Sequence, residues 1–359
     1  MKFYFIIKSF LKLKVEYLFL ILNIKIYSYK ILKQINDKKR DKLILFYDLS
    51  VSSVAYGDFF YAIYLLKLLR KYKQIELQII CDKLRPDFYK TNPSTTKEKK
   101  IEELINFSIN IFIDENKKNE IKITKINWHS ALKILKNERS NILFYNLIKK
   151  RKPIYKISYN ILSLIYKQLI KKNSDDIFLS KNIYEFNKLK IPTKDYITIG
   201  TRIDYKNELN RNIDPAKFIQ IIEIVKKKFP RDKIFIVSDY KGCLVLEDAL
   251  KDFSNVYYSK NYSKNFYQDG LIILNSKFYL QVLGSGISVF AEHSKIPYEL
   301  YTDYKFCGFR AKKIIRSNFI HFQKKTLFYS PWQLEHQKKI HADNLNHFFK
   351  LNDYYEKNL

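Results

Sequence analysis

Two short stretches of the sequence carry residues that are suited to holding an anionic ligand. The first follows an apolar run that ends at Gly200, and it contains basic and amide side chains: Arg202, Lys206, Arg211 and Asn212. Arginine binds phosphate through two parallel hydrogen bonds. The second is the turn Gly284, Ser285 and Gly286, whose small residues leave backbone N–H groups accessible beside the start of a helix. Together they predict a phosphate-bearing ligand in the C-terminal half of the chain.

Other polar residues stand where strands are expected to end. Ser238 and Asp239 close a strand expected at 233–238, and they either form an ordinary turn or contact the base or ribose of a ligand. Gly57 and Asp58 lie between a strand end and a helix start. Asp58 is interpreted in two ways, as a helix cap or as a base that takes a proton from an acceptor hydroxyl.

The C-terminal half has the pattern of an open α/β domain. Between Tyr196 and Tyr301 the sequence predicts strand, arginine-bearing loop, helix, strand, short loop, helix, strand, glycine turn, helix and strand. The expected helices include 217–229 and 244–253, and the expected strands include 256–258 and 278–283. In such a sheet, the polar turns lie at the carboxyl ends of the strands, where ligands bind.

The N-terminal half repeats this logic. A strand at 43–49, a helix from Phe59 and a strand at 77–82 predict a right-handed crossover and a parallel pair. Further expected elements are helices at 101–107 and 154–170 and strands at 109–113, 121–126, 142–145 and 177–179. We therefore predict an α/β protein with two Rossmann-like domains.

The domain bounds follow from changes in composition. We predict a basic N-terminal segment (1–40), an acceptor domain (41–180), a donor domain (181–330) and a helical tail (331–359), with the boundary near Pro192. In the first segment lysines interrupt the apolar residues, and its longest apolar run, 17–22, is too short to span a bilayer, which takes about 20 residues. This segment is predicted either to lie in a membrane interface as an amphipathic helix or to pack on the N-terminal domain.

Composition excludes some functions. The net charge of +30 accompanies high Lys, Ile, Asn and Tyr contents and few glycines and prolines, a pattern typical of an AT-rich genome, so nucleic-acid binding is not expected. The cysteines have no paired spacing, the histidines form no ligand pattern and no Asp-x-Asp pair stands between strands. We predict no metal and no cofactor. His293 is interpreted as a packing residue.

These motifs resemble those of sugar transferases with two Rossmann domains, the GT-B architecture. The Gly57-Asp58 turn looks like the start of bacterial heptosyltransferases, and Gly284-Ser285-Gly286 through Lys295-Ile296-Pro297 has the spacing of that family's Asp-Thr-Gly…Lys-x-Pro motif. The run from Ile199 to Asp204 resembles the arginine motif of the α-1,6- and protein-O-fucosyltransferases, in which the arginine neutralises the leaving nucleotide diphosphate.

The resemblance implies a metal-independent glycosyltransferase of the hexosyl-, heptosyl- or fucosyltransferase kind. Arg202, with Lys206 or Arg211, would stabilise the diphosphate, and Asp58 would activate the acceptor. Its substrates would be a nucleotide sugar and a cell-surface glycan or lipid-linked acceptor, as in lipopolysaccharide or polysaccharide biosynthesis. The expected location is the cytoplasm, with peripheral attachment to the anionic inner face of the cell membrane. A non-catalytic nucleotide- or glycan-binding module and a nucleic-acid-binding protein are the alternatives.

Overall fold

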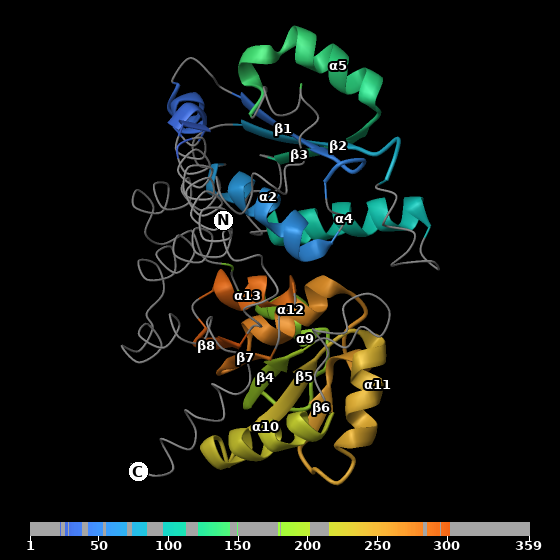
Figure 1. Ribbon diagram of the computed structural model, residues 1–359, viewed down its shortest axis with the longest axis vertical. Helices are drawn as coiled ribbons and strands as arrows, with labels where there is room; N and C mark the ends of the chain where they lie inside the picture. The colour runs from blue at the N-terminus through green and yellow to red at the C-terminus, as the bar shows by residue number, and fades with distance from the viewer. Residues whose placement is uncertain are drawn as a thin grey trace, which may run out of the picture.

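In the computed structural model, the chain forms two α/β units, each built on a parallel sheet (Figure 1). The structure describes residues 22, 26–27, 29–37, 42–52, 55–69, 74–84, 96–112, 121–143, 149, 179, 181–201, 215–282, 286–294 and 296–301. The described strands of the first sheet lie between Lys42 and Ile126, and those of the second between Tyr196 and Tyr301. The predicted α/β class with two Rossmann-like units is confirmed.

The first sheet, within the described residues, contains β1 (Lys42–Asp48), β2 (Gln74–Ile80) and β3 (Ile121–Ile126), paired in that order. Helix α5 (Trp128–Asn137) covers one face, and α2 (Tyr56–Leu69) and α4 (Lys97–Phe112) cover the other (Figure 1). Each face carries its own apolar cluster, which explains why β1 is buried along nearly its whole length.

The second sheet has the order β6-β5-β4-β7-β8, with all pairs parallel. Its strands are β4 (Tyr196–Gly200), β5 (Lys233–Val237), β6 (Val256–Tyr258), β7 (Tyr279–Val282) and β8 (Tyr298–Tyr301). The chain runs outward from β4 through β5 to β6, and then returns to place β7 on the other side of β4. Strand order therefore reverses between β4 and β7, which makes this border the topological switch point of the sheet.

Helices cover both faces of the second sheet. On one face, α10 (Pro215–Lys228) and α11 (Tyr240–Ala249) pack through Phe218 and Leu246. On the other, α12 (Phe266–Leu274) and α13 (Val289–Glu292) bury apolar side chains against the sheet and against the first unit. Helix α10 follows β4 and α13 follows β7, so the two connections leave the switch point toward opposite faces.

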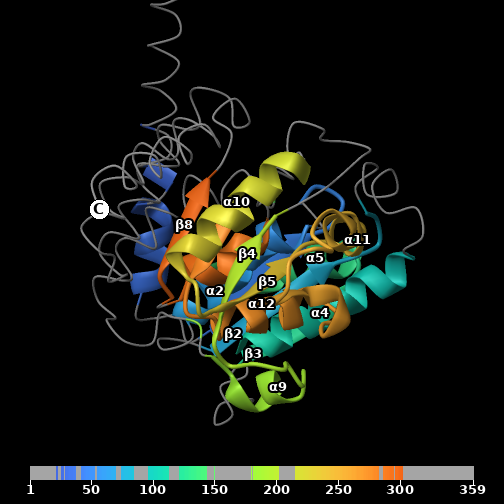
Figure 2. The ribbon, with the colours of Figure 1, turned by 90° about the horizontal axis from the view of Figure 1, so that it is seen from below.

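The layers follow one another from end to end of the molecule. Figure 1 shows α5, the first sheet, α2 with α4, then α12 with α13, the second sheet, and finally α10 with α11. Figure 2, seen from below, shows α10 and α11 nearest the viewer and the short helix α9 (Ile183–Asn187) at one side. One apolar cluster includes residues of both units, so the two units share a core at this seam.

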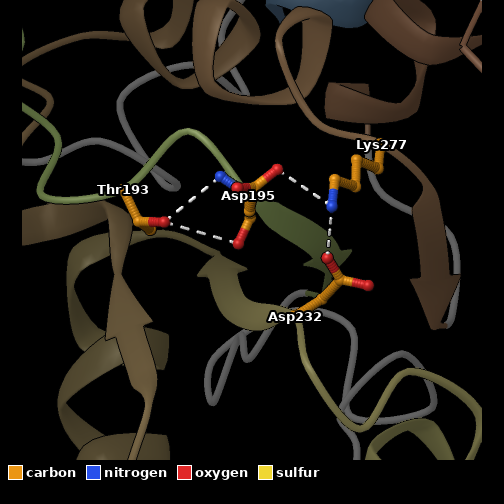
Figure 3. A network of polar contacts seen from close by, with 4 residues as sticks. All are labelled: Thr193, Asp195, Asp232 and Lys277. Atoms are coloured by element: carbon orange, nitrogen blue, oxygen red, sulfur yellow. Dashed lines mark hydrogen bonds and ion pairs between the residues drawn. The ribbon is translucent and has the colours of Figure 1, made fainter.

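A polar network fastens the amino-terminal edge of the second sheet (Figure 3). Lys277 precedes β7, and its Nζ lies 2.9 Å from Asp195 Oδ1 and 2.8 Å from Asp232 Oδ1. Asp195 and Asp232 precede β4 and β5 respectively, and the Asp195 backbone N–H donates to Thr193 Oγ1 (3.1 Å). These contacts join the starts of three strands.

Most expected elements are present, with corrections. The strand expected at 109–113 is wrong in its described part, because α4 continues to Phe112 with Leu104, Phe107 and Ile111 buried at helical spacing. Helix α11 begins at Tyr240, earlier than expected, and α12 was missed. In the described part of the strand expected at 142–145, Ile142 forms an isolated β-bridge to Ile44. The helix expected at 154–170 and residues 177–178 lie outside the described residues.

The described part of the N-terminal segment includes a helical stretch at 29–36. Ile31, Leu32 and Ile35 are buried in the core of the first unit, as the packing alternative predicts. Leu22, Ile26 and Tyr29 are exposed. The rest of the segment, the tail 331–359 and residues 302–330 lie outside the described residues, and the predicted domain bounds stay predictions.

None of the described helices combines the length and the apolar character that crossing a membrane requires.

Candidate functional site

The switch point between β4 and β7 is the centre of the candidate site. Gly200, the last residue of β4, is packed so closely that an added Cβ would lie 2.1 Å from Tyr279 Oη. Its carbonyl oxygen accepts a hydrogen bond from Gln281 Nε2 (3.0 Å). A glycine is therefore required here by the contact between the two strands. Beyond this contact, the chain from β4 continues through Thr201 into the arginine loop, and the chain from β7 continues into the glycine turn.

Most of the predicted phosphate-binding residues lie outside the described residues. These are Arg202, Lys206, Arg211, Asn212, Gly284 and Ser285. The ends that carry them are described: β4 ends at Gly200, α10 begins at Pro215, β7 ends at Val282 and the 3₁₀ turn η5 (Gly286–Ser288) follows the glycine turn. Because β4 pairs with β7, the arginine loop and the glycine turn depart from adjacent strands.

Two buried hydroxyl groups lie at the carboxyl ends of β4 and β5. The Thr201 N–H donates to the Val237 carbonyl (3.0 Å), which brings Thr201 beside Ser238 on the neighbouring strand. Neither Thr201 Oγ1 nor Ser238 Oγ has a hydrogen-bond partner among the described residues. A buried hydroxyl without a partner costs free energy, so such a pair indicates a place where a ligand completes the hydrogen bonding. Sequence reasoning found Ser238 and missed Thr201.

Asp239 has a structural role in this loop. It is the N-cap of α11, and its Oδ1 accepts a hydrogen bond from the Gly242 N–H (2.7 Å). Gly242 is also required sterically, since a Cβ there would lie 2.2 Å from Ser238 Oγ. Asp239 therefore has the role in an ordinary turn that one interpretation predicted. Its contact to a base or ribose stays a prediction, and Oδ2 would have to make it because Oδ1 already accepts from Gly242.

The structure brings together the two glycines that the sequence singled out separately. A Cβ on Gly57 would lie 2.7 Å from the Gly286 Cα, and a Cβ on Gly286 would lie 3.2 Å from the Gly57 Cα. The start of α2 in the first unit therefore touches the start of η5 in the second, backbone against backbone. The contact leaves no room for a side chain at either position. The backbone that approaches Gly286 closely is therefore that of Gly57.

Asp58 is the neighbour of this contact. Helix α2 begins at Tyr56, so Asp58 lies inside the first turn, and the idea that it is the N-cap residue is wrong. Position 58 is next to the point where the two units meet. The proposed base and the proposed donor turn are in this sense brought together by Gly57 and Gly286.

Aromatic side chains seal the seam beside the glycines. Tyr56 stacks on Phe266 of α12 with ring centroids 4.7 Å apart and an interplanar angle of 11°. His293 lies against Tyr64 (4.3 Å between centroids), its Nδ1 is 2.8 Å from the Val289 carbonyl, and burial lowers the pKa of its imidazole to about 3. His293 packs, as predicted, and is neutral at physiological pH.

A buried lysine lies at the edge of this seam. Lys100 Nζ is 3.6 Å from the centroid of the Tyr56 ring and 3.4 Å from Glu103 Oε2, and the Tyr56 hydroxyl donates to the same oxygen (2.6 Å). Burial lowers the pKa of the Lys100 ammonium group. The sequence offered no signal for this cluster, because its members come from α2 and α4 and meet only through tertiary packing.

No metal site is found among the described residues, where no three His, Cys, Asp or Glu side chains cluster. Cys81 and Cys243 are free thiols, and burial raises the pKa of each.

No family model matches the sequence, and no curated protein is significantly similar to it. Among solved structures, an E. coli ADP-heptose LPS heptosyltransferase II matches 72% of this chain and 83% of its own, with 10% identity and a TM-score of 0.38. POFUT1 in complex with GDP matches 72% of this chain and 98% of its own, with 11% identity and a TM-score of 0.36. A UDP-GlcNAc 2-epimerase from Neisseria meningitidis matches 83% and 98%, with 10% identity and a TM-score of 0.38.

Similarity at this level indicates no reaction, since one fold hosts many functions.

Proposed function

We propose that this protein is a glycosyltransferase that binds a nucleotide-sugar donor at the switch point between β4 and β7. One observation carries the proposal: the arginine loop and the glycine turn, recognised independently in the sequence, follow two adjacent strands on the two sides of that point. In open α/β sheets ligands bind in the crevice outside the carboxyl ends of the strands at this position. The unpaired hydroxyls of Thr201 and Ser238 support it.

The proposed chemistry is dominated by the leaving group. As the glycosidic bond breaks through an oxocarbenium-like state, charge develops on the nucleotide diphosphate. Arg202, assisted by Lys206 or Arg211, would stabilise that charge, together with N–H groups of the Gly284-Ser285-Gly286 turn. Asn212, Ser238 and Asp239 would contact other parts of the donor. Asp58 would accept the proton of the acceptor hydroxyl.

In this proposal the basic side chains stabilise the charge that develops on the nucleotide diphosphate, and a metal ion is not required. Treatment with EDTA should leave turnover unchanged. A loss of turnover that Mg²⁺ or Mn²⁺ restores would contradict this part of the proposal.

We further propose a cell-surface glycan or lipid-linked acceptor, and attachment to the anionic inner face of the membrane. Support comes from the exposed Leu22, Ile26 and Tyr29, which recur at helical spacing near Lys30 and Lys33. Deleting residues 1–40 would also remove the buried Ile31, Leu32 and Ile35, so the test is substitution. Replacing Leu22, Ile26 and Tyr29 by glutamate should weaken binding to vesicles containing phosphatidylserine and leave nucleotide binding intact; unchanged vesicle binding would contradict the membrane role.

The decisive experiment is a thermal-shift panel with GDP, UDP, ADP and CMP, followed by turnover assays with sugar conjugates of the nucleotide that binds. Stabilisation together with release of the free nucleotide supports a transferase. Stabilisation without turnover across a panel of glycan acceptors supports the non-catalytic binding module. Absence of any nucleotide effect, with salt-sensitive retention on RNA or DNA, would instead support the nucleic-acid-binding alternative.

Asp58→Asn tests the acceptor side. The base hypothesis expects near-normal donor binding and stability with turnover reduced about 10²-fold or more. Wild-type turnover in this variant would make Asp58 structural.

A further inference from the structure

A half-buried carboxyl group of the second unit takes no part in the proposed chemistry. Asp269 is in the first turn of α12. Its Oδ1 accepts a hydrogen bond from the Ser263 hydroxyl, and the Ser263 N–H donates to the Ser259 carbonyl oxygen (2.8 Å). Ser259 is the first residue after β6 and is almost completely buried. Asp269 therefore ties both ends of the turn between β6 and α12.

The same contacts continue to the end of β5. Cys243 of α11 lies with its Sγ 3.9 Å from Ser259 Oγ and 3.7 Å from the Ser238 carbonyl oxygen. Ser238 also carries one of the two hydroxyls of the candidate site that have no partner among the described residues, and from its carbonyl oxygen the contacts run through Cys243, Ser259 and Ser263 to Asp269. The turn that Asp269 holds therefore packs through Cys243 against the residue that follows β5.

A second tie acts on the same turn from its exposed side. Asn265, the N-cap of α12, accepts a hydrogen bond from the Gln268 N–H (3.0 Å), and Gln268 Oε1 accepts one from the Lys264 N–H (2.7 Å). This pair caps the helix and makes no contact with Ser259 in the hydrogen bonds that the structure describes. It offers a matched control, because it stabilises the start of α12 through hydrogen bonds that involve neither Ser259 nor Ser263.

We propose that Asp269 is a positioning residue of the donor site: it holds the Ser259–Ser263 turn against the carboxyl ends of β5 and β6 and so sets the wall against which the nucleotide binds. This inference rests on the proposed function. The chemical class of the ligand is a nucleoside diphosphate, and Asp269 acts through Ser259 and Ser263 without touching it.

The environment of Asp269 fits this role. Burial raises the pKa of its carboxyl group to about 6, against the opposing effect of the Ser263 and Ser259 hydrogen bonds. The ionisable group facing it from α11 is the Cys243 thiol, and the turn contributes the two serine hydroxyls. What positions the turn is a hydrogen-bond acceptor, which asparagine can supply and alanine cannot.

The test compares Asp269→Ala, Asp269→Asn and Gln268→Ala in the full chain. Affinity is measured by calorimetry, well below the unfolding temperature, for whichever of GDP, UDP, ADP or CMP binds the wild type. We expect nucleotide affinity to fall about 10-fold or more in Asp269→Ala, where the Ser263 hydroxyl loses its acceptor, and to stay within about 3-fold of wild type in Asp269→Asn. Gln268→Ala should lower the unfolding temperature and leave the affinity within about 3-fold.

Two results would overturn the inference: wild-type affinity in folded Asp269→Ala, or an equal loss in Gln268→Ala. If Asp269→Ala does not fold, Ser263→Ala replaces it with the same expected direction. If the wild type binds none of the four nucleotides, the proposed function fails instead. Amide hydrogen exchange across Ser259–Asn265 then still decides the positioning role, because faster exchange in Asp269→Ala but not in Asp269→Asn is required.

Discussion

At the two edges of the second sheet, polar groups differ in whether they are exposed and whether they have partners. At the amino-terminal edge, Lys277 and Asp195 are exposed, and with Asp232 they pair as shown in Figure 3. At the carboxyl-terminal edge, Thr201 and Ser238 bury hydroxyls that have no partner among the described residues. Exposed ion pairs form at little cost and contribute little stability, whereas a buried unpaired hydroxyl is costly.

This difference indicates which edge is shaped by function. A fold retains buried polar groups that destabilise it where a bound ligand supplies the hydrogen bonds that these groups lose on leaving water. Paired charges at an exposed edge need no such explanation, since solvent and neighbours satisfy them. The predictions below test this contrast.

The largest effect is expected at the arginine loop. Arg202→Ala should reduce turnover about 10²- to 10³-fold and weaken nucleotide binding while the fold survives, because a charge that stabilises the leaving diphosphate is lost. Arg202→Lys should also be impaired, since a point charge cannot replace a bidentate fork. Turnover assays and calorimetry measure both. Unchanged nucleotide affinity in folded Arg202→Ala would remove the arginine loop from the site.

The next effect concerns stability at the seam. Gly57→Ala should lower the free energy of unfolding by about 1–3 kcal/mol, because the new Cβ collides with the Gly286 backbone. Gly286→Ala should cost less, since its Cβ would meet the Gly57 Cα at the longer distance of 3.2 Å. Urea unfolding of both variants gives the comparison. If both variants were as stable as the wild type, the two units would have to be separate at this point in solution.

Asp269 should make stability depend on pH. Its pKa of about 6 in the folded state is above the unfolded value of about 3.9, so its contribution is fully present below the unfolded pKa and is lost as the pH rises through about 6. The shift corresponds to about 2–3 kcal/mol. Asp269→Asn, which does not ionise, should gain stability relative to wild type between pH 4.5 and pH 8 by up to that amount. Parallel stability curves for the two proteins would rule out this titration.

Thr201→Val separates stability from binding. Valine has nearly the same shape and removes a buried hydroxyl without a partner, so the free energy of unfolding should stay constant or rise by up to about 1 kcal/mol. Nucleotide affinity should fall about 5- to 10-fold, because the ligand loses a hydrogen bond. Thermal unfolding with and without nucleotide measures both quantities. If stability falls and affinity does not, the hydroxyl has a structural role.

The smallest effect is expected at the opposite edge. Lys277→Ala removes both ion pairs of the network in Figure 3, yet Asp195 and Asp232 can then interact with water. Nucleotide affinity should not change, and the unfolding temperature should move little. A loss of affinity comparable to that of Thr201→Val would show that the two edges are coupled and would remove the contrast between them.

Local patterns were sufficient for part of the site. A strand ending in glycine predicted β4, and the helix expected at 217–229 is present as α10, which begins slightly earlier, at Pro215, a residue suited to the first helical position. The paired turn Ser238-Asp239 predicted the end of β5. The same local reasoning failed in the described part of 109–113, where an apolar run predicted a strand although the buried positions of α4 follow a helical period. It also failed at α12, whose apolar residues are buried nearly all round, so no amphipathic pattern marks it.

The sequence by itself determined the α/β class, the parallel sheets and much of the order of strands and helices along the chain, with the exceptions of α12 and the end of α4. Those properties depend on residues close in sequence: apolar runs, caps, and glycines at strand ends. Only the tertiary structure decided that β7 lies beside β4 and that Gly57 meets Gly286. These contacts join segments far apart in the chain, and they depend on which faces of the sheets the helices cover. That choice is made by packing the shared core, which no local pattern encodes.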